Sequence, residues 1–417
     1  MTQHTNLWRH ADFLALWSSQ TLAALSAQIT QFALPLIAAL TLQASPFEMG
    51  LLVTMATLPN LLVGLFAGSW VDHMRRRPLM IAADITRAAL LVSIPIASVF
   101  NLLTLAQLYS VLFLFGIGTT VFDVANVSYL PVLVGRPHVL EANSRIVAST
   151  SFAGAVGPGL AGVLVQLITA PMAILVDAVS LVLSAALLNT IRFEETDPAS
   201  YDDSTSLWTD IAIGLQTLYG EPLLRFITGS SMLYLFFNNI MVAVYVLYAI
   251  RELAIAPAAL GVIYALGGVG AILGAIIAIP IAQRLGIGYT LIIANLIGGF
   301  FLLLVPMAKA IPIAAIVVLG VAQCASQMMG AVFYISQTSL RQMLTPDPML
   351  GRVSASYRFL TMGMIPLGAL LGGILGETVG LRHTVTVGVI GMLLPSLWLV
   401  CSPIRTVHTV NNDSAPS

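Results

Sequence analysis

Long apolar runs separated by short polar segments make up most of this chain. Each run has about 20 residues, the length that an α-helix needs to cross the hydrocarbon core of a bilayer. The pattern therefore predicts an all-α integral membrane protein with twelve transmembrane helices. The expected spans are 13–40, 48–71, 79–100, 105–128, 146–168, 171–191, 226–250, 258–283, 288–308, 312–335, 354–376 and 382–402.

The longest polar stretch, FEETDPASYDDSTSLWTD at 193–210, divides the chain into halves with six expected spans each. Its acidic composition predicts a flexible start to the linker. Between Leu207 and Tyr219 apolar residues recur every three or four positions, which predicts a short amphipathic helix at the cytoplasmic surface. We expect an N-terminal six-helix bundle at 1–192, a cytoplasmic linker with that helix at 193–223, and a C-terminal six-helix bundle with a short tail at 224–417.

The two halves resemble each other in sequence. SYLPVLVGRPHVLEANS, Ser128 to Ser144, aligns without gaps on TSLRQMLTPDPMLGRVS, Thr338 to Ser354, at an offset of 210. Nearby, Asp84 aligns on Asn295 at an offset of 211. These matches predict a parallel repeat, in which a pseudo-two-fold axis along the membrane normal relates the two six-helix bundles.

Composition narrows the functional classes. The chain is 58% hydrophobic and 8% charged, whereas a soluble domain carries roughly 25% charged residues. The net charge of −1 gives no reason to expect nucleic-acid binding. Cys324 and Cys401 lie far apart in apolar segments, and the six histidines are scattered without metal-ligand spacing. We therefore expect no metal and no cofactor.

The basic residues predict the orientation. With the N-terminus in the cytoplasm, most arginines fall in cytoplasmic segments, including the cluster at 75–77. The outer segments then carry Arg251, Lys309 and Arg382. Positively charged residues favour the cytoplasmic side of a membrane protein. The sequence thus predicts a multi-pass protein of the cell (inner) membrane with both termini in the cytoplasm.

Two motifs resemble those of a known family. The loop GSWVDHMRRRP, Gly68 to Pro78, is similar to the signature loop of the major facilitator superfamily, although Arg75 stands where the family usually has a second Gly. AGAVGPGLAG, Ala153 to Gly162, resembles the Gly-Pro motif of its drug:proton antiporters. The Asp84–Arg87 pattern and GRVS at 351–354 resemble the branch of macrolide-efflux pumps and enterobactin exporters.

The resemblance implies a gating loop that clamps the two halves on the cytoplasmic side. Its expected members are Gly68, Asp72, Arg75, Arg76 and Arg77. A carboxylate at a helix end can pair with Arg or accept hydrogen bonds from another helix N-terminus. The alternative for the arginines is a role as positive-inside anchors that touch anionic lipid.

Span 5 carries a second conformational candidate. Pro158 removes a backbone donor and bends the helix, while Gly157 and Gly162 permit close packing of neighbouring helices. These three residues predict a hinge for alternation between states. Tight packing without any hinge motion is the other interpretation, and the two are compatible.

Ionisable residues within spans are costly and therefore candidates for function. One of them could carry a coupled proton, or they could form a charge network that stabilises one conformation. Asp84 and Arg87 are three residues apart on span 3 and can form a pair. The candidates for proton coupling or for a charge network are Asp84, Arg87, Asp123, Asp177 and Arg358.

Polar residues recur along one face of spans 1, 7 and 10. Uncharged amides and phenols on inward faces would suit a large amphipathic ligand, whereas interhelical hydrogen bonding is the alternative use of such residues. The candidate cavity residues, which include one from span 4, are Gln28, Gln31, Asn126, Tyr234, Asn238, Gln323, Gln327 and Tyr334.

No phosphate-binding loop of the form GxxxxGK[ST], HExxH motif or GxSxG motif occurs in the sequence, so we expect neither catalytic residues nor an enzyme. The leading hypothesis is a monomeric secondary transporter that exports an amphipathic small molecule, such as a drug, macrolide-like compound or siderophore, by proton antiport with alternating access. Its partners would be the substrate, protons and the lipid bilayer. Uptake or facilitated transport of a metabolite is the alternative, and a non-transporting membrane receptor or enzyme is a third.

Overall fold

The structure is a computed structural model that describes residues 7–193, 195, 207–308, 312–346 and 349–406. Within these residues it contains helices and no strands, and twelve helical segments are long and apolar enough to cross a membrane. The segments are α1 (Ala11–Leu36), α2 (Pro46–Asp72), α3 (Arg76–Val99), α4 (Leu105–Val134), α5 (Val139–Ile168), α6 (Ala170–Thr190), α8 (Pro222–Leu247), α9 (Pro257–Leu285), α10 (Ile287–Leu302) with α11 (Leu304–Met307), α12 (Pro312–Leu344), α13 (Leu350–Thr378), and α14 (Leu381–Gly391) with α15 (Leu394–Val400).

The prediction of an all-α membrane fold is confirmed, but several helices are longer than their apolar runs. The helix α12 has 33 residues and α13 has 29, because both continue through flanking polar residues. The helix α12 ends two residues before Pro346, as expected from the restricted backbone of residues that precede proline. The last span is interrupted at Met392 and Leu393, between α14 and α15. Pro395 is the second residue of α15, and its missing N–H removes the hydrogen bond that a continuous helix would make to the Gly391 carbonyl oxygen.

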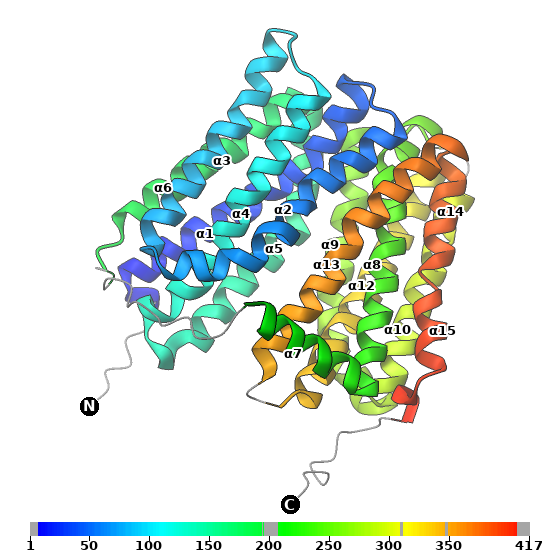
Figure 1. The fold of residues 1–417 in the computed structure, drawn as a ribbon. Helices are drawn as coiled ribbons and strands as arrows, with labels where there is room; N and C mark the ends of the chain where they lie inside the picture. The colour runs from blue at the N-terminus through cyan, green and yellow to red at the C-terminus, as the bar shows by residue number, and fades with distance from the viewer. Residues whose placement is uncertain (1–6, 194, 196–206, 309–311, 347–348, 407–417) are drawn as a thin grey trace, which may run out of the picture. The chain divides into compact units, whose positions relative to one another are not determined.

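Contacts divide the chain into two compact units. One contains α1 to α6 together with Ala256–Ala265 at the start of α9, and the other contains α7, α8 and the chain from Leu266 onward. In the first unit α6 packs against α1 and α3, and α4 packs against α2 and α3 (Figure 1). In the second unit α8 packs against α13, α14 and α15, while α10 packs against α12.

The internal repeat has a backbone signature. α1 and α8 each end in a five-residue π-helical turn, at Ile37–Thr41 and Tyr248–Glu252. The residues that follow at equivalent positions, Gln43 and Ala254, both have φ of 53°. Both pairs of equivalent residues lie 211 positions apart, the offset at which Asp84 aligns on Asn295. A shared irregularity of this kind is independent support for two related halves, because π turns are rare.

The predicted amphipathic helix exists as α7 (Leu207–Gly220). Its apolar side packs on protein: Leu218 is buried in a cluster with Leu224 and Val353. Gly214 lies so close to α13 that a Cβ atom there would be 2.5 Å from the Arg352 carbonyl oxygen. The helix therefore packs on α8 and α13. The acidic part of the expected linker lies almost entirely outside the described residues.

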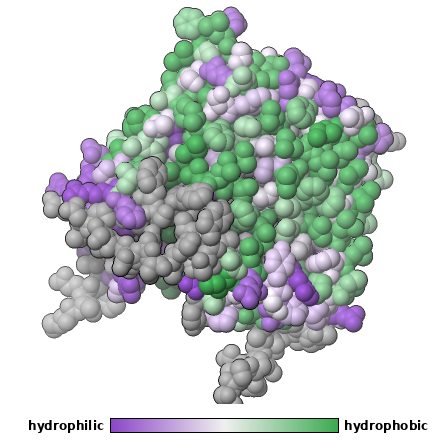
Figure 2. Space-filling view, in the orientation of Figure 1, coloured by the Kyte–Doolittle hydropathy of each residue, from purple (hydrophilic) through white to green (hydrophobic). Residues whose placement is uncertain are grey.

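The middle stretches of the helices are apolar on the outside as well as inside. Figure 2 shows hydrophobic residues over much of the visible helix surface, with hydrophilic ones more frequent towards helix ends. Large apolar side chains such as Leu167, Ile276 and Phe300 are at least 65% exposed. Exposure of so many apolar side chains to water would be unfavourable, whereas lipid chains solvate them.

Small residues allow the helices of the second unit to approach closely. At Gly368 on α13, a Cβ atom would lie 2.2 Å from the Phe236 carbonyl oxygen on α8, and at Gly372 it would lie 2.4 Å from that of Ile240. Backbone contact of this kind is how membrane helices gain packing energy without a hydrophobic driving force. It aligns α8 and α13 along one wall of the cavity described next.

Candidate functional site

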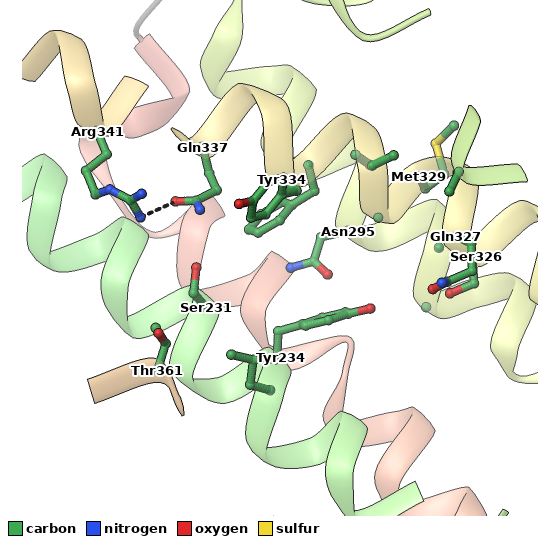
Figure 3. A pocket seen from close by; sticks show the side chains of 18 of the residues that line it. Ser231, Tyr234, Asn295, Ser326, Gln327, Met329, Tyr334, Gln337, Arg341 and Thr361 are labelled. Carbon is green, nitrogen blue, oxygen red and sulfur yellow. Dashed lines mark hydrogen bonds between the residues drawn. The ribbon is translucent and has the colours of Figure 1, made fainter. Parts of the chain in front are cut away.

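The candidate binding site is a cavity of about 650 Å³ within the second unit. It lies among the membrane-spanning helices α8, α10, α12 and α13, and Figure 3 shows ten of its side chains labelled. The polar residues that line it are Ser231, Tyr234, Asn295, Ser326, Gln327, Tyr334, Gln337, Arg341, Ser354, Tyr357, Arg358 and Thr361. Its size falls within the range of small-molecule sites, about 300–1,000 Å³.

Helical periodicity brings the α12 residues into line. Gln327, Gly330, Tyr334, Gln337 and Arg341 follow one another at intervals of three or four, so they share one face of the helix. From α8, Ser231 and Tyr234 face the same space in Figure 3. The sequence predicted a polar face on each of these helices, without Arg341, and Tyr234, Gln327 and Tyr334 of those faces line one cavity.

Two of the expected cavity residues in this unit are not among the lining residues. Asn238 on α8 and Gln323 on α12 do not line the cavity. Gln323 instead packs against α9, where a Cβ atom on Gly267 would lie 2.8 Å from Gln323 Cγ. Of the expected cavity residues, Tyr234, Gln327 and Tyr334 do line it, and so does Arg358, which was expected as a candidate for proton coupling or a charge network.

Arg341 is held at one end of the cavity by aromatic and amide contacts. Its guanidinium carbon lies 3.8 Å from the centre of the Tyr357 ring, and Nη1 donates to Gln337 Oε1 at 3.5 Å. The Nε2 of Gln337 in turn donates to the Tyr357 hydroxyl at 3.0 Å. Cation–π and amide contacts orient the cation without neutralising it.

A further polar group in the cavity wall, Nδ2 of Asn295, has no hydrogen-bond partner among the described residues, and this side chain is 5% exposed. The Ser231 hydroxyl, equally buried, lies beside the Tyr357 hydroxyl. In Figure 3 the Asn295 amide points into the space between the Tyr234 and Tyr334 rings. A buried donor without a partner costs free energy, so a ligand acceptor at this place would be stabilising.

Sequence reasoning did not assign Asn295, Tyr357 or Arg341 to the cavity. Asn295 is an isolated amide in a strongly apolar span, and Arg341 has the spacing of a positive-inside anchor at a helix end. One signal was available for Arg341, because it continues the polar face of α12 by one turn beyond Gln337. Nothing in the sequence of α10 alone indicates which way Asn295 points.

The first unit contains the predicted Asp84–Arg87 pair. Arg87 Nη2 contacts Asp84 Oδ1, and the other carboxylate oxygen accepts a 2.6 Å hydrogen bond from Ser184 of α6. The Arg87 guanidinium also lies 4.6 Å from the centre of the Phe122 ring. Asp84 is 0% and Arg87 6% exposed. A buried ion pair with such complementary contacts connects α3 with α4 and α6.

Asp177 of α6 is buried without such a countercharge. It is 1% exposed, and Oδ1 accepts a 2.7 Å hydrogen bond from Ser26 of α1. The Thr30 hydroxyl of α1 also lies beside the carboxyl group, and Asp177 forms no ion pair among the described residues. A carboxyl group in this setting can gain or lose a proton without breaking an ion pair. Asp123, the other acidic candidate, has an exposed side chain on α4.

The expected polar face of α1 has two different environments in the structure. Gln28 packs against α5, where a Cβ atom on Gly157 would lie 2.5 Å from its Cβ and Cγ atoms. The side chain of Gln31 is exposed. The amide of Gln20 donates to Asn126 Oδ1 of α4 at 2.6 Å, so Asn126 makes an interhelical hydrogen bond.

The arginines after α2 hold the start of α3 against the end of α6. Arg77 donates from Nε to the Leu188 carbonyl oxygen at 2.9 Å and from Nη2 to that of Asn189 at 2.6 Å. Arg76 forms an ion pair with Glu195 at 3.4 Å, and the side chain of Arg75 is exposed. Cations near the carboxyl end of a helix are stabilising. Gly68 and Asp72 lie on α2, with side chains outside the described part.

The Gly-Pro motif is a site of close backbone contact. Pro158 lies inside α5, and Gly162 lies one turn further on. A Cβ atom on Gly162 would be 2.9 Å from the Cα atom of Gly261, which lies in the Ala256–Ala265 segment of the same unit. Tight packing is thus present at this motif, as one of the two interpretations expected.

No group of three or more His, Cys, Asp or Glu side chains that could hold a metal ion occurs in the described ranges. The arrangement instead combines a polar, aromatic cavity in one unit with buried ionisable residues in the other. Such a combination within twelve apolar spans is typical of secondary transporters. The fold and the site together therefore indicate a membrane transporter.

The comparisons with known proteins agree with that class. The model of the Major Facilitator Superfamily matches residues 16–369. This chain belongs to the Major Facilitator Superfamily, and it is a membrane transporter and not an enzyme.

Its relatives are distant. "Uncharacterized MFS-type transporter YfiS" of Bacillus subtilis is 28% identical, over 88% of this chain and 87% of the relative. "Multidrug efflux pump Tap" of Mycolicibacterium fortuitum is 23% identical, over 94% and 98%. "Macrolide efflux protein A" of Streptococcus pyogenes is 21% identical, over 97% and 98%.

Solved structures support the fold alone. A bacterial homologue of the iron transporter ferroportin in its inward-facing state has a TM-score of 0.76 at 17% identity. The match covers 95% of this chain and 99% of that structure.

Proposed function

We propose that this transporter exports an amphipathic small molecule from the cell in exchange for protons, by alternating access of its two halves. The distant likeness to a multidrug and a macrolide efflux pump supports the direction of transport. The cavity of about 650 Å³ supports an organic solute, because aromatic rings and amides alternate along its wall. The protein would lie in the cell (inner) membrane as a monomer with both termini in the cytoplasm.

The observation that carries the proposal is the cavity among α8, α10, α12 and α13. The Tyr234 and Phe333 rings stack at a centroid distance of 6.4 Å beside it. Tyr334 and Tyr357 add two more rings, and all the charge in the wall comes from arginine. An apolar body with a few polar groups would be complementary to such a wall.

The buried carboxyl groups of the first unit support proton coupling. Asp84 is paired with Arg87, so releasing it would leave a buried cation without its partner. Asp177 has a hydroxyl partner and no basic partner among the described residues. We propose Asp177 as the leading proton carrier, with Asp123 as the second candidate. The gating loop at 68–77 and the hinge at Gly157, Pro158 and Gly162 would control the alternation.

The test is cellular accumulation of a macrolide, a catecholate siderophore and a lipophilic cationic dye. Cells without their own pumps are compared with and without this protein, before and after a protonophore is added. Lower accumulation of at least one compound, abolished by the protonophore, is the expected result. Unchanged accumulation of all three compounds, or increased uptake of one of them, would contradict proton-driven export.

A further inference from the structure

All the charged residues in the cavity wall are basic. Its lining residues include two cations, Arg341 and Arg358, and no Asp or Glu. The acidic side chains described elsewhere in the second unit, Glu221, Glu252 and Glu377, lie at helix ends away from the cavity. The described wall therefore carries a net positive charge within a bundle of membrane-spanning helices, where unneutralised charges are costly.

Arg341 does not have the contacts of a simple membrane anchor. An anchor extends its guanidinium into water or towards lipid headgroups, whereas this guanidinium lies over the Tyr357 ring and lines the cavity. Its Nε atom is buried without a hydrogen-bond partner among the described residues. Arg341 is thus oriented by Tyr357 and Gln337, with part of its donor capacity unused.

The remaining polar groups add donors to these cations. Asn295 Nδ2 is buried without a hydrogen-bond partner in the described part of the chain, and the buried Ser231 hydroxyl lies beside the Tyr357 hydroxyl. Figure 3 places Ser231 on the same side of the cavity as Gln337, and Asn295 between two tyrosine rings. Two guanidinium groups and an unused amide donor together form a site for an acceptor-rich anion.

We infer that this cavity recognises an amphipathic organic anion, whose carboxylate or similar acidic group binds Arg341 and Arg358 while its aromatic body lies among the tyrosines. The inference rests on the proposed export of a small molecule and names its chemical class. A cationic solute would meet two like charges at the wall, which is unfavourable in a low-dielectric site. Substrates that are weak bases are therefore expected to bind poorly here.

The test uses three probes that share one ring system and differ in charge. They are 2-naphthaleneacetic acid, its amide, and 2-(2-naphthyl)ethylamine, titrated calorimetrically near neutral pH into the purified full chain in phosphatidylcholine discs. The acid is expected to bind at least about tenfold more tightly than the amide, the effect of one charge-assisted hydrogen bond. The amine is expected to bind more weakly than the amide.

Variants separate recognition from folding. Arg341→Gln and Arg358→Gln should each remove most of the preference for the acid over the amide, while both variants keep binding the amide. Arg284→Gln, which removes a charge at the end of α9 outside the cavity wall, is the matched control and should keep the preference. Arg358→Glu, at an exposed position, should shift the preference towards the amine.

Discs that contain phosphatidylglycerol test whether the site binds an anionic lipid headgroup or a free organic anion. If that lipid competes with the acid, an anionic headgroup also occupies the site; if it does not, the site selects free organic anions. Equal binding of all three probes, a preference for the amine, or no binding of any probe would overturn the inference. Those results would leave the proposed export intact, since protonophore-sensitive export of any compound in cells tests it separately.

Discussion

Arg87 shows how single residues make a buried charge compatible with a membrane-spanning helix. Its guanidinium contacts Asp84, lies over Phe122 and donates to Thr119 at 3.4 Å, while Ser184 donates to the second Asp84 oxygen. These contacts come from three helices, α3, α4 and α6. Removal of one partner of a buried pair is far more costly than removal of both, because one charge is then left without compensation.

Asp84→Asn should therefore lower the thermal unfolding midpoint of the purified protein strongly, through a loss of about 3–5 kcal/mol. Asp84→Asn combined with Arg87→Met should recover much of that loss, since no unpaired charge remains. Ser184→Ala, which removes one hydrogen bond, should cost about 1 kcal/mol. Midpoints measured by scanning fluorimetry in detergent would check this order. If Asp84→Asn were as stable as the unaltered protein, this prediction would be wrong.

At equivalent positions the two halves share backbone conformation more closely than they share residue identity. The π turns after α1 and α8 correspond, and so do the starts of α6 and α14, where Thr169 and Gly380 have φ of 79° and 90° and ψ of 153° and 160°. This backbone region is accessible essentially to Gly alone. The second half has Gly at this position, and the first half holds a β-branched residue in the same strained conformation.

Thr169→Gly should consequently stabilise the protein. Relief of about 1–3 kcal/mol of backbone strain is offset in part by the greater entropy of Gly in the unfolded chain, which leaves a gain of about 1 kcal/mol. The reverse change, Gly380→Thr, should destabilise it, and it serves as the matched comparison. Thermal midpoints of both variants check the prediction. An unchanged or lower midpoint for Thr169→Gly would show that its backbone is not strained.

At the scale of the whole molecule the two units carry different chemistry. The first unit has buried acids bonded to hydroxyl groups, as at Asp177 and Ser26. The second has a cationic aromatic cavity with no acidic residue in its described wall. An antiporter moves two ligands through one conformational cycle, so loss of either binding site stops the exchange even where the other site still binds its ligand.

Asp177→Asn should abolish protonophore-sensitive export while the naphthalene probes still bind with affinities within about threefold of the unaltered protein. The reason is that an amide keeps the volume and the Ser26 hydrogen bond but cannot release a proton. Export assays in cells and calorimetry on the purified variant provide the two measurements. Asp123→Asn is assayed in parallel. Full export by Asp177→Asn and none by Asp123→Asn would identify Asp123 as the carrier.

The orientation predicted from the arginines is tested by fusions. Green fluorescent protein attached after residue 417 should fluoresce, because it folds in the cytoplasm. Alkaline phosphatase inserted between α3 and α4, in the segment 100–104, should be active, because it requires the outer compartment. The reversed result for both reporters would place the termini outside and would also reverse the assignment of cytoplasmic loops.

The sequence by itself determined the twelve spans, the two related halves, the Asp84–Arg87 pair and the polar faces of α8 and α12. These features depend on helix length, on hydropathy and on spacing within one helix, all of which are local. The tertiary structure alone decided that Asn295 and Tyr357 join those faces around one cavity, and that Asn126 is bonded to Gln20. Periodicity shows which residues share a face of one helix. The direction in which that face points depends on contacts between helices that are distant in the sequence.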